Sequence, residues 1–233
     1  MAGGAVGIKI GLLVGIAVGT ALWTSVGDAE DAKPEALPAT ADQLVTRVSE
    51  RVAALADYSC IADTESRLGD KTDSGSFQVW CKKPHQFRVK ILRGKDKDAE
   101  IAVSSDGNIR AHKGGLLKGF VIRLEPTDSR LKSLRGTPVT DLAWDAFARD
   151  LHDHSALPGA SATLATPADT PGTLEATVLF AQGEHKIRET YRVDAQTWLP
   201  VLGDVYEDDV RVDHLAYHDV NPAPNLDDNW FRL

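Results

Sequence analysis

The segment from His185 to Val220 alternates apolar and polar side chains with a period of two, which constrains the fold more than any other feature of the sequence. This is the period of a β-strand, because successive side chains of a strand point to opposite faces of its sheet. Turn-forming residues interrupt the alternation at 194–197 and again at 207–209. We therefore predict three consecutive antiparallel strands with one apolar face and one face in contact with water.

The chain upstream of this segment predicts two helices and further strands. Thr40 and Gln43 form a capping box at the start of an apolar stripe with helical spacing that ends near Ala56. A second helix should follow Thr140, which lies at the N-cap position, and end at 152–155. Strand-type segments are 58–68, 76–83, 87–92, 100–104, 109–112, 120–125 and 173–182, with a polar connection at 126–138 and a weak edge strand or loop at 157–171.

The order of these elements indicates the fold class. A helix, a run of strands, one inserted helix and more strands are typical of an α+β fold in which a curved antiparallel sheet carries its helices on one face. A chain of 233 residues, of which 42% are hydrophobic, is long enough for one core of ordinary size. We place this single domain at residues 40–233.

The N-terminal residues predict export from the cytoplasm. Residues 10–26 contain no charged side chain, as in a signal peptide, and Gly27-Asp28-Ala29 has the small residues of a weak cleavage site. We assign residues 1–28 to a signal peptide or an uncleaved membrane anchor. Residues 29–39, which are acidic and contain two prolines, should be an exposed linker. The protein would then be periplasmic, or anchored in the membrane and facing the periplasm.

The charge of the chain bears on its partners. A formal net charge of -8 argues against a nucleic-acid partner, since phosphate binding needs a basic surface. The charge is unevenly distributed: residues 82–97 hold seven Lys and Arg residues against one Asp, whereas residues 204–228 hold eight acidic residues against one Arg. These segments are either two solvated strand faces, or the first is a basic rim for an anionic lipid or partner.

Export bears on the two cysteines, because a chain outside the cytoplasm can keep a disulfide. A hairpin centred near Asp70 and Lys71 would set Cys60 opposite Cys81 on the apolar face of two adjacent strands. We predict a disulfide between them, which would contribute about 3 kcal/mol in the chain-entropy model. Two buried thiols are the alternative.

The sequence contains no recognisable catalytic or metal-binding motif. The serines at 104–105 lack the Gly-x-Ser-x-Gly pattern, and the adjacent carboxylates at 208–209 and 227–228 lie in acidic turns. His214 and His218 would stand about 13 Å apart on a strand, which is too far for one ion. His152 and His154 fall at the C-terminal end of a helix, where their interaction with the helix dipole is favourable. We expect no catalytic residue, no cofactor and no metal.

Several stretches carry a family resemblance. They are Ala54–Leu68, Arg123–Asp128, Thr137–Leu142 and Tyr191–Phe231, the last with Leu199-Pro200-Val201. They resemble an exported bacterial family, domain-of-unknown-function family 1571, which is related to the periplasmic lipoprotein carriers LolA and LolB. The resemblance covers most of residues 41–231 and implies an unclosed antiparallel half-barrel with helices on its concave face. Such a face, lined by apolar residues, suits acyl chains.

These observations favour a non-catalytic protein that binds a lipid or the acyl chain of a lipidated protein. The candidate lining residues are the inward apolar residues of the strands and the second helix: Phe77, Val79, Phe87, Val89, Ile91, Phe120, Ile122, Leu124, Trp144, Phe147, Val178 and Phe180. They are either the lining of a cavity or the members of a solid core. The alternatives to a carrier are a periplasmic scaffold or sensor that binds an envelope protein, and a hydrolase. Residues 1–28 would supply any membrane association.

Overall fold

The computed structural model describes residues 36–114 and 119–233, so the predicted export segment and most of the linker lie outside the described residues. In chain order the first elements are α1 (Ala41–Ala54), β1 (Asp57–Leu68), β2 (Lys71–Lys82), β3 (Gln86–Arg93), β4 (Glu100–Val103), β5 (Ile109–His112) and β6 (Val121–Leu124). Next come η2 (Ser129–Leu131), η3 (Val139–Leu142), α2 (Trp144–Ser155) and the edge strand β7 (Ser161–Ala165). The last are β8 (Thr173–Gln182), β9 (His185–Asp194), β10 (Pro200–Glu207), β11 (Val210–Asn221) and η4 (Asp228–Phe231).

The eleven strands of the described residues form one antiparallel sheet in the order β6-β5-β4-β3-β2-β1-β11-β10-β9-β8-β7. Two meanders, one from each half of the chain, join where β1 pairs with β11. Because β6 and β7 pair on one side only, the sheet has two free edges and is not closed into a barrel. This confirms the predicted α+β fold with an unclosed antiparallel sheet.

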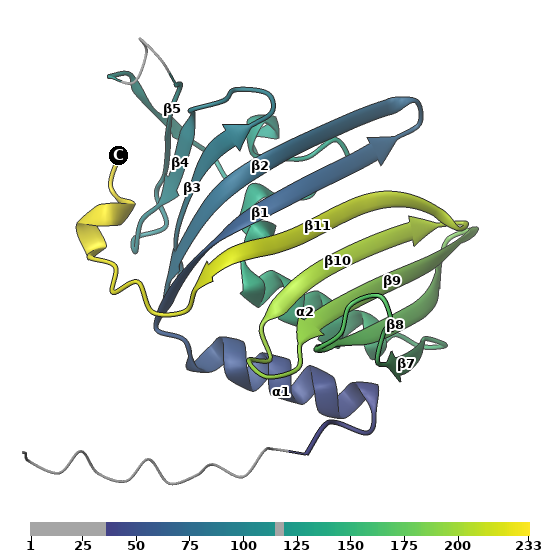
Figure 1. Ribbon diagram of the computed structural model, residues 1–233. Coiled ribbons are helices and arrows are strands. Elements are labelled where there is room, and N and C mark those ends of the chain that lie inside the picture. Colours follow the sequence, from purple (N-terminus) through teal and green to yellow (C-terminus); the bar gives the residue numbers. More distant parts are fainter. Residues whose placement is uncertain (1–35, 115–118) are drawn as a thin grey trace, which may run out of the picture. The chain divides into compact units, whose positions relative to one another are not determined.

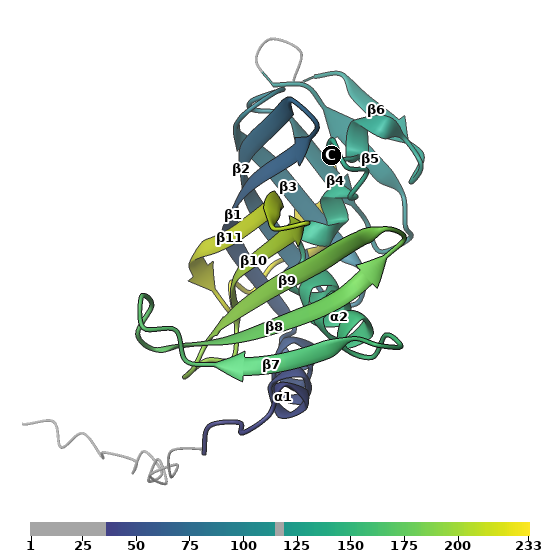
Figure 2. The same cartoon turned by 90° about the vertical axis from the view of Figure 1, so that its right-hand side faces the viewer.

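The sheet bends around α2, and α1 packs against α2 at one end (Figures 1 and 2). We call the side of the sheet that faces α2 the concave face. Its side chains, those of both helices and those of the connection between β6 and α2 form one hydrophobic cluster. The helices therefore lie on the concave face, as predicted.

The start of α1 follows the predicted capping box. Thr40 is the N-cap, and its hydroxyl accepts a hydrogen bond from the backbone N–H of Gln43 at 3.3 Å. The Gln43 side chain accepts in turn from the backbone N–H of Ala39 at 2.7 Å. The first bond satisfies a donor that a helix leaves unpaired at its first turn, and the second holds the residue before the N-cap against the helix. The apolar stripe of this amphipathic helix, with Leu44 and Val48, is fully buried.

The second helix begins later than predicted. Residues 139–142, which include Thr140, form η3, and α2 starts at Trp144 after an N-cap, Ala143, that has no side chain to cap it. The cap comes from another element: the hydroxyl of Tyr58 on β1 accepts the backbone N–H of Trp144 at 2.8 Å. A buried tertiary contact thus replaces the local capping residue that the sequence favoured.

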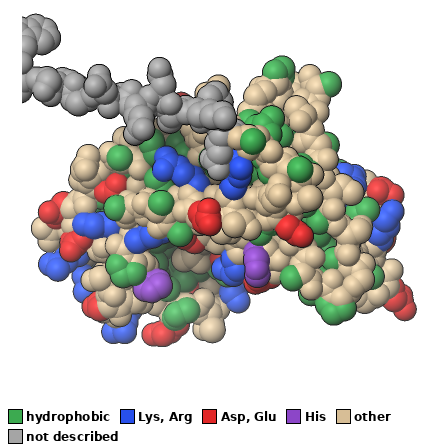
Figure 3. Space-filling model, turned by 90° about the horizontal axis from the view of Figure 1, so that it is seen from below, with side chains coloured by type: hydrophobic (Ala, Val, Ile, Leu, Met, Phe, Trp, Pro, Cys, Tyr) green, Lys and Arg blue, Asp and Glu red, His purple; other side chains and the backbone are tan. Residues whose placement is uncertain are grey.

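The surface of the described residues carries interspersed charges. On the face shown in Figure 3, acidic, basic and hydrophobic side chains are mixed. Four of the seven basic residues in the stretch 82–97 pair with carboxylates, for example Lys82 with Asp228 at 2.5 Å and Lys83 with Asp145 at 3.3 Å. No helix in the described part of the chain has the length and apolar character needed to cross a membrane.

Candidate ligand-binding face

Apolar side chains cross the concave face in rows that run from strand to strand. Cross-strand pairing aligns Cys60, Val79, Val89, Ile101 and Ala111 in one row, and all five are buried. Side chains two residues away along each strand point to the same face. The predicted lining residues of the strands accordingly share this face: Phe77, Val79, Phe87, Val89, Ile91, Ile122, Leu124, Val178 and Phe180.

Most of these residues pack against one another. The buried members of the hydrophobic cluster are Val79, Phe87, Val89, Leu124, Trp144, Phe147 and Val178, and Phe77 and Phe180 pack against them half-buried. Ile91 is half-buried as well. Phe120 and Ile122 differ, with exposed fractions of 72% and 42%. Ile122 lies on the edge strand β6, where the sheet ends, and Phe120 comes just before this strand, so neither shares the predicted burial.

The helix α2 places two aromatic rings over the centre of this face. The Trp144 indole stacks on Tyr58 with ring centroids 4.1 Å apart and planes 5° from parallel. The Phe147 ring meets Tyr191 edge-on at 5.1 Å. A Cβ built on Gly203 would lie 3.8 Å from the Phe147 ring, in ordinary van der Waals contact, so the ring packs directly over the backbone of β10 there. The rings therefore fill the middle of the bend.

Two polar atoms in this aromatic layer lack hydrogen-bond partners in the described part of the chain. They are the indole Nε1 of Trp144 and the hydroxyl of Tyr217, whose rings meet edge-on with centroids 6.2 Å apart. Burial raises the pKa of Tyr217 well above its ordinary value, so the group stays a neutral hydroxyl. An unpaired buried donor costs about 1–3 kcal/mol. A hydrogen-bond acceptor brought within reach of either group would remove that group's cost.

Polar contacts fasten the C-terminal end of α2 to the concave face. His154 Nδ1 lies 2.6 Å from Oε2 of Glu189 on β9, and the Tyr191 hydroxyl donates to the same oxygen at 2.7 Å. Glu189 is buried, and its hydrogen bond is the main cause of a raised pKa at His154. The arrangement is therefore a charge-assisted bond from helix to sheet.

A second basic residue fastens the connection between β6 and α2. Arg135 contacts Glu207 at 3.1 Å and Asp213 at 3.2 Å, on β10 and β11, and donates to the carbonyl of Arg67 at 3.4 Å. Burial raises the pKa of Asp213. We call residues 125–155 the cover, because Leu131, Leu142 and α2 within it bury the concave face. The cover is thus held by aromatic packing at its centre and by ion pairs toward one end.

The predicted disulfide is wrong. Both cysteines are free and buried, because the β1–β2 hairpin turns at Gly69 and Asp70, with Leu68 paired to Lys71. This shifts the register by two residues from the prediction, so Cys60 faces Val79 and Cys81 faces Tyr58. Desolvation by burial raises the pKa of both thiols, that of Cys81 to about 12.

The four histidines considered as metal ligands each lie beside a carboxylate, His154 beside Glu189 as described above. His214 lies 2.6 Å from Asp204, His218 is 3.2 Å from Asp63, and His152 contacts the adjacent Asp153. Within residues 36–114 and 119–233, no group of three or more His, Cys, Asp or Glu side chains could hold a metal ion.

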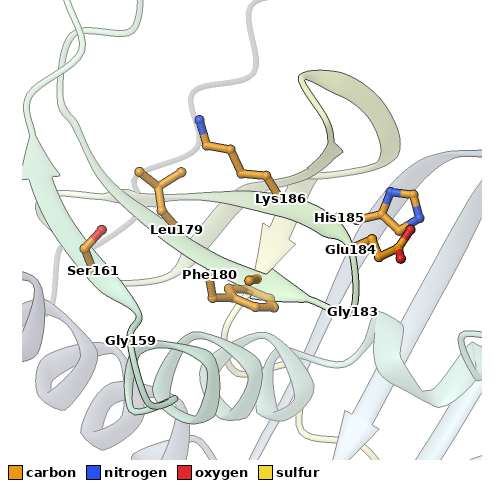
Figure 4. Close-up of a pocket in the computed structure, with 9 residues that line it drawn as sticks. Gly159, Ser161, Leu179, Phe180, Gly183, Glu184, His185 and Lys186 are labelled. Carbon is orange, nitrogen blue, oxygen red and sulfur yellow. The ribbon is translucent and has the colours of Figure 1, made fainter.

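A depression of about 340 Å³ lies at the β7 edge of the sheet, around the turn between β8 and β9 and near the C-terminal end of α2 (Figure 4). Phe180 points toward the helix, whereas Leu179 and Lys186 point to the other side of the sheet. The Phe180 ring lies 5.2 Å from the ring of His154. The depression therefore borders the contact that holds α2 to β9.

Sequence reasoning missed Glu189, Arg135 and Tyr58 as residues of this site. The inward direction of Glu189 could have been predicted from the sequence. Glu189 is two residues from both Ile187 and Tyr191 on one strand, so its side chain points to the same face as theirs. A charged residue on an apolar face needs a partner, but nothing in the sequence identified His154, 35 residues away, as that partner.

We compared the chain with protein families, curated proteins and solved structures. No protein-family model matches the chain, and no curated protein does. Among solved structures, LprF from Mycobacterium bovis is 12% identical, with a TM-score of 0.46 over 80% of this chain and 94% of that one. The LolA superfamily protein NE2245 from Nitrosomonas europaea is 14% identical, with a TM-score of 0.43 over 84% and 99%. A DUF1329 family protein from Desulfovibrio piger is 13% identical, with a TM-score of 0.41 over 82% and 95%. The comparisons thus include the LolA superfamily, while the resemblance to family 1571 stays a prediction.

Proposed function

We propose that the chain is a non-catalytic exported protein that binds a lipid-type ligand, an apolar chain bearing a carbonyl or ester group, between α2 and the concave face. The observation that carries the proposal is the pair of unpartnered buried donors, Trp144 Nε1 and the Tyr217 hydroxyl. A single ligand carbonyl has two lone pairs and could accept from both. The apolar rows around them would take the chain.

Entry of a ligand requires the cover to move, because aromatic rings fill the bend when it is closed. The contacts of Arg135 and of His154 are polar, and water can replace such contacts when a segment lifts away. Each methylene of a ligand that entered would gain about 0.8 kcal/mol from burial. Opening at the polar end is therefore the route that the contacts favour.

A direct test is native mass spectrometry of protein purified from its own envelope, followed by titration of delipidated protein with a fluorescent fatty acid. A co-purified lipid and saturable binding are the expected results. Absence of any lipid in both experiments would refute the proposal.

The variant Tyr217→Phe tests the role of the donors. It removes an unpaired buried hydroxyl, so the ligand-free protein should gain about 1 kcal/mol in unfolding free energy, while lipid affinity falls about threefold to tenfold. The matched control is Tyr206→Phe on β10, since Tyr206 lies beneath the guanidinium of Arg188 and is not among the unpaired groups. Equal lipid affinity of wild type and Tyr217→Phe would contradict the assignment of the donors.

A scaffold or sensor that binds a protein is the second candidate. One observation favours it: Phe120, Val121 and Ile122 are consecutive and exposed at the edge of the sheet. An apolar surface outside the core is what a protein-binding site requires.

A further inference from the structure

The two free edges of the sheet differ in what they expose. On β7 the outward residues are Ser161, Thr163 and Ala165, and the apolar ones between them pack inward. Beside and within β6, Phe120, Val121 and Ile122 are 72%, 44% and 42% exposed. Exposed apolar edge strands are sites of pairing with another chain, and proteins usually protect them with charges, prolines or bulges. Of these two edges, β6 is therefore the one that exposes apolar side chains.

The backbone of β6 is suited to pairing. It pairs with β5 through four consecutive residue pairs, from Ile109 with Leu124 to His112 with Val121, without a register shift. Among residues 36–114 and 119–233, no strand pairs with its other side, as Figure 2 shows. An outward row of N–H and C=O groups thus lies free for an added strand.

The charges beside β6 indicate what this strand would contain. Arg123 on β6 lies directly opposite Arg110 on β5, and like charges in this position destabilise a sheet. Arg110 donates to a backbone oxygen of Leu233 at 3.3 Å, and neither arginine forms an ion pair with a side-chain carboxylate of the described residues. A carboxylate on an adjacent strand would offset their repulsion.

We infer that β6 is the docking strand for an extended peptide in which acidic and apolar residues alternate. Side chains of β6 alternate between faces, with Arg123 on one and Ile122 on the other. A strand added beside it would place its acidic residues next to Arg123 and its apolar residues next to Ile122 and Phe120. A second copy of this chain fits less well, because its own β6 would bring another arginine pair to the same edge.

The test uses a labelled synthetic peptide of about six residues, in which valine or isoleucine alternates with aspartate or glutamate, and the purified protein. Binding is measured by fluorescence anisotropy, and amide hydrogen exchange is followed across residues 120–124. The peptide should bind and slow exchange in β6. A peptide of the same composition with its acidic residues consecutive should bind at least fivefold less tightly. Absence of binding at millimolar peptide, or binding that leaves exchange in β6 unchanged, would overturn the inference.

A charge exchange makes the test specific. Arg123→Glu relieves the repulsion with Arg110 and should leave the fold intact, while affinity for the acidic peptide falls by about fivefold or more. A peptide with lysine in place of each acidic residue should bind this variant better than it binds wild type. Lys186→Glu, an exposed change on β9, is the control and should alter neither affinity.

The lipid titration separates this inference from the proposed function, since Arg123 lies on the other face of β6 and the peptide would contact the exposed Phe120 and Ile122, not the buried pair Trp144 and Tyr217. Loss of peptide binding with intact lipid binding contradicts only the role of β6. Self-association of the free protein through β6, seen as a dimer by light scattering that Arg123→Glu alters, would contradict the peptide as its occupant.

Discussion

Tyr58 and Trp144 contact each other in two ways across the concave face. Their rings stack at 4.1 Å, and the Tyr58 hydroxyl accepts the first backbone N–H of α2 at 2.8 Å. Both side chains are almost fully buried, and burial raises the pKa of Tyr58 well above its ordinary value. One residue of β1 therefore fixes both the position of α2 and the place where it begins.

The variant Tyr58→Phe separates these two roles. It keeps the stacked ring and removes the acceptor, leaving the Trp144 backbone N–H buried without a partner. We expect the unfolding free energy, measured by urea denaturation, to fall by about 1–3 kcal/mol. The same change at Tyr206 should cost much less, and equal losses at the two positions would show that the hydroxyl does not act as the cap.

The cysteines give a prediction opposite to the one that their sequence positions suggested. Labelling under denaturing, non-reducing conditions should find two free thiols in each chain. The folded protein should react slowly, because both side chains are buried and their raised pKa values leave little thiolate. Recovery of no free thiol from the denatured protein would instead establish the disulfide.

The hairpin between β1 and β2 shows which features of the fold can be predicted from the sequence. Alternation located both strands and their apolar faces, and a shift of two residues keeps every side chain on its face. The turn itself decides the register, and Gly69, with a φ of 59°, occupies the left-handed region that favours glycine. Gly-Asp is a recognised two-residue hairpin turn, so the correct register could have been predicted from the sequence.

Other parts of the site could not be predicted in this way. The exposure of Phe120 and Ile122 depends on β6 being the last strand, and strand order is a tertiary property. The contacts of His154 with Glu189 and of Arg135 with Glu207 join residues 35 and 72 positions apart. Local patterns carry no information on such pairs, so they require the assembled fold.

The contact between His154 and Glu189 predicts a dependence of stability on pH. The hydrogen bond to Glu189 raises the pKa of His154 in the folded state above its unfolded value of about 6.5. Asp150 and Asp153 add to this, and partial burial opposes it. The stabilisation is thus fully present below about pH 6.5 and is lost as the pH rises through the folded value.

The measurement compares wild type with His154→Gln by urea denaturation at pH 6 and pH 9. The loss in unfolding free energy caused by the substitution should be larger at pH 6. His152→Gln, an exposed position on the same helix, should change stability little at either pH. A His154→Gln effect that is the same at both pH values would show that the charged form of His154 does not hold α2.

The indole N–H of Trp144 reports most directly on whether a ligand binds within the concave face. The protein contains five tryptophans, and Trp144→Phe identifies the signal of this one in a nitrogen-15 NMR spectrum. On adding a fatty acid or lysophospholipid, its proton should move downfield as Nε1 donates to the ligand carbonyl, while a tryptophan outside the core, Trp230, stays in place. An unchanged Trp144 signal at saturating lipid would contradict the proposed binding site.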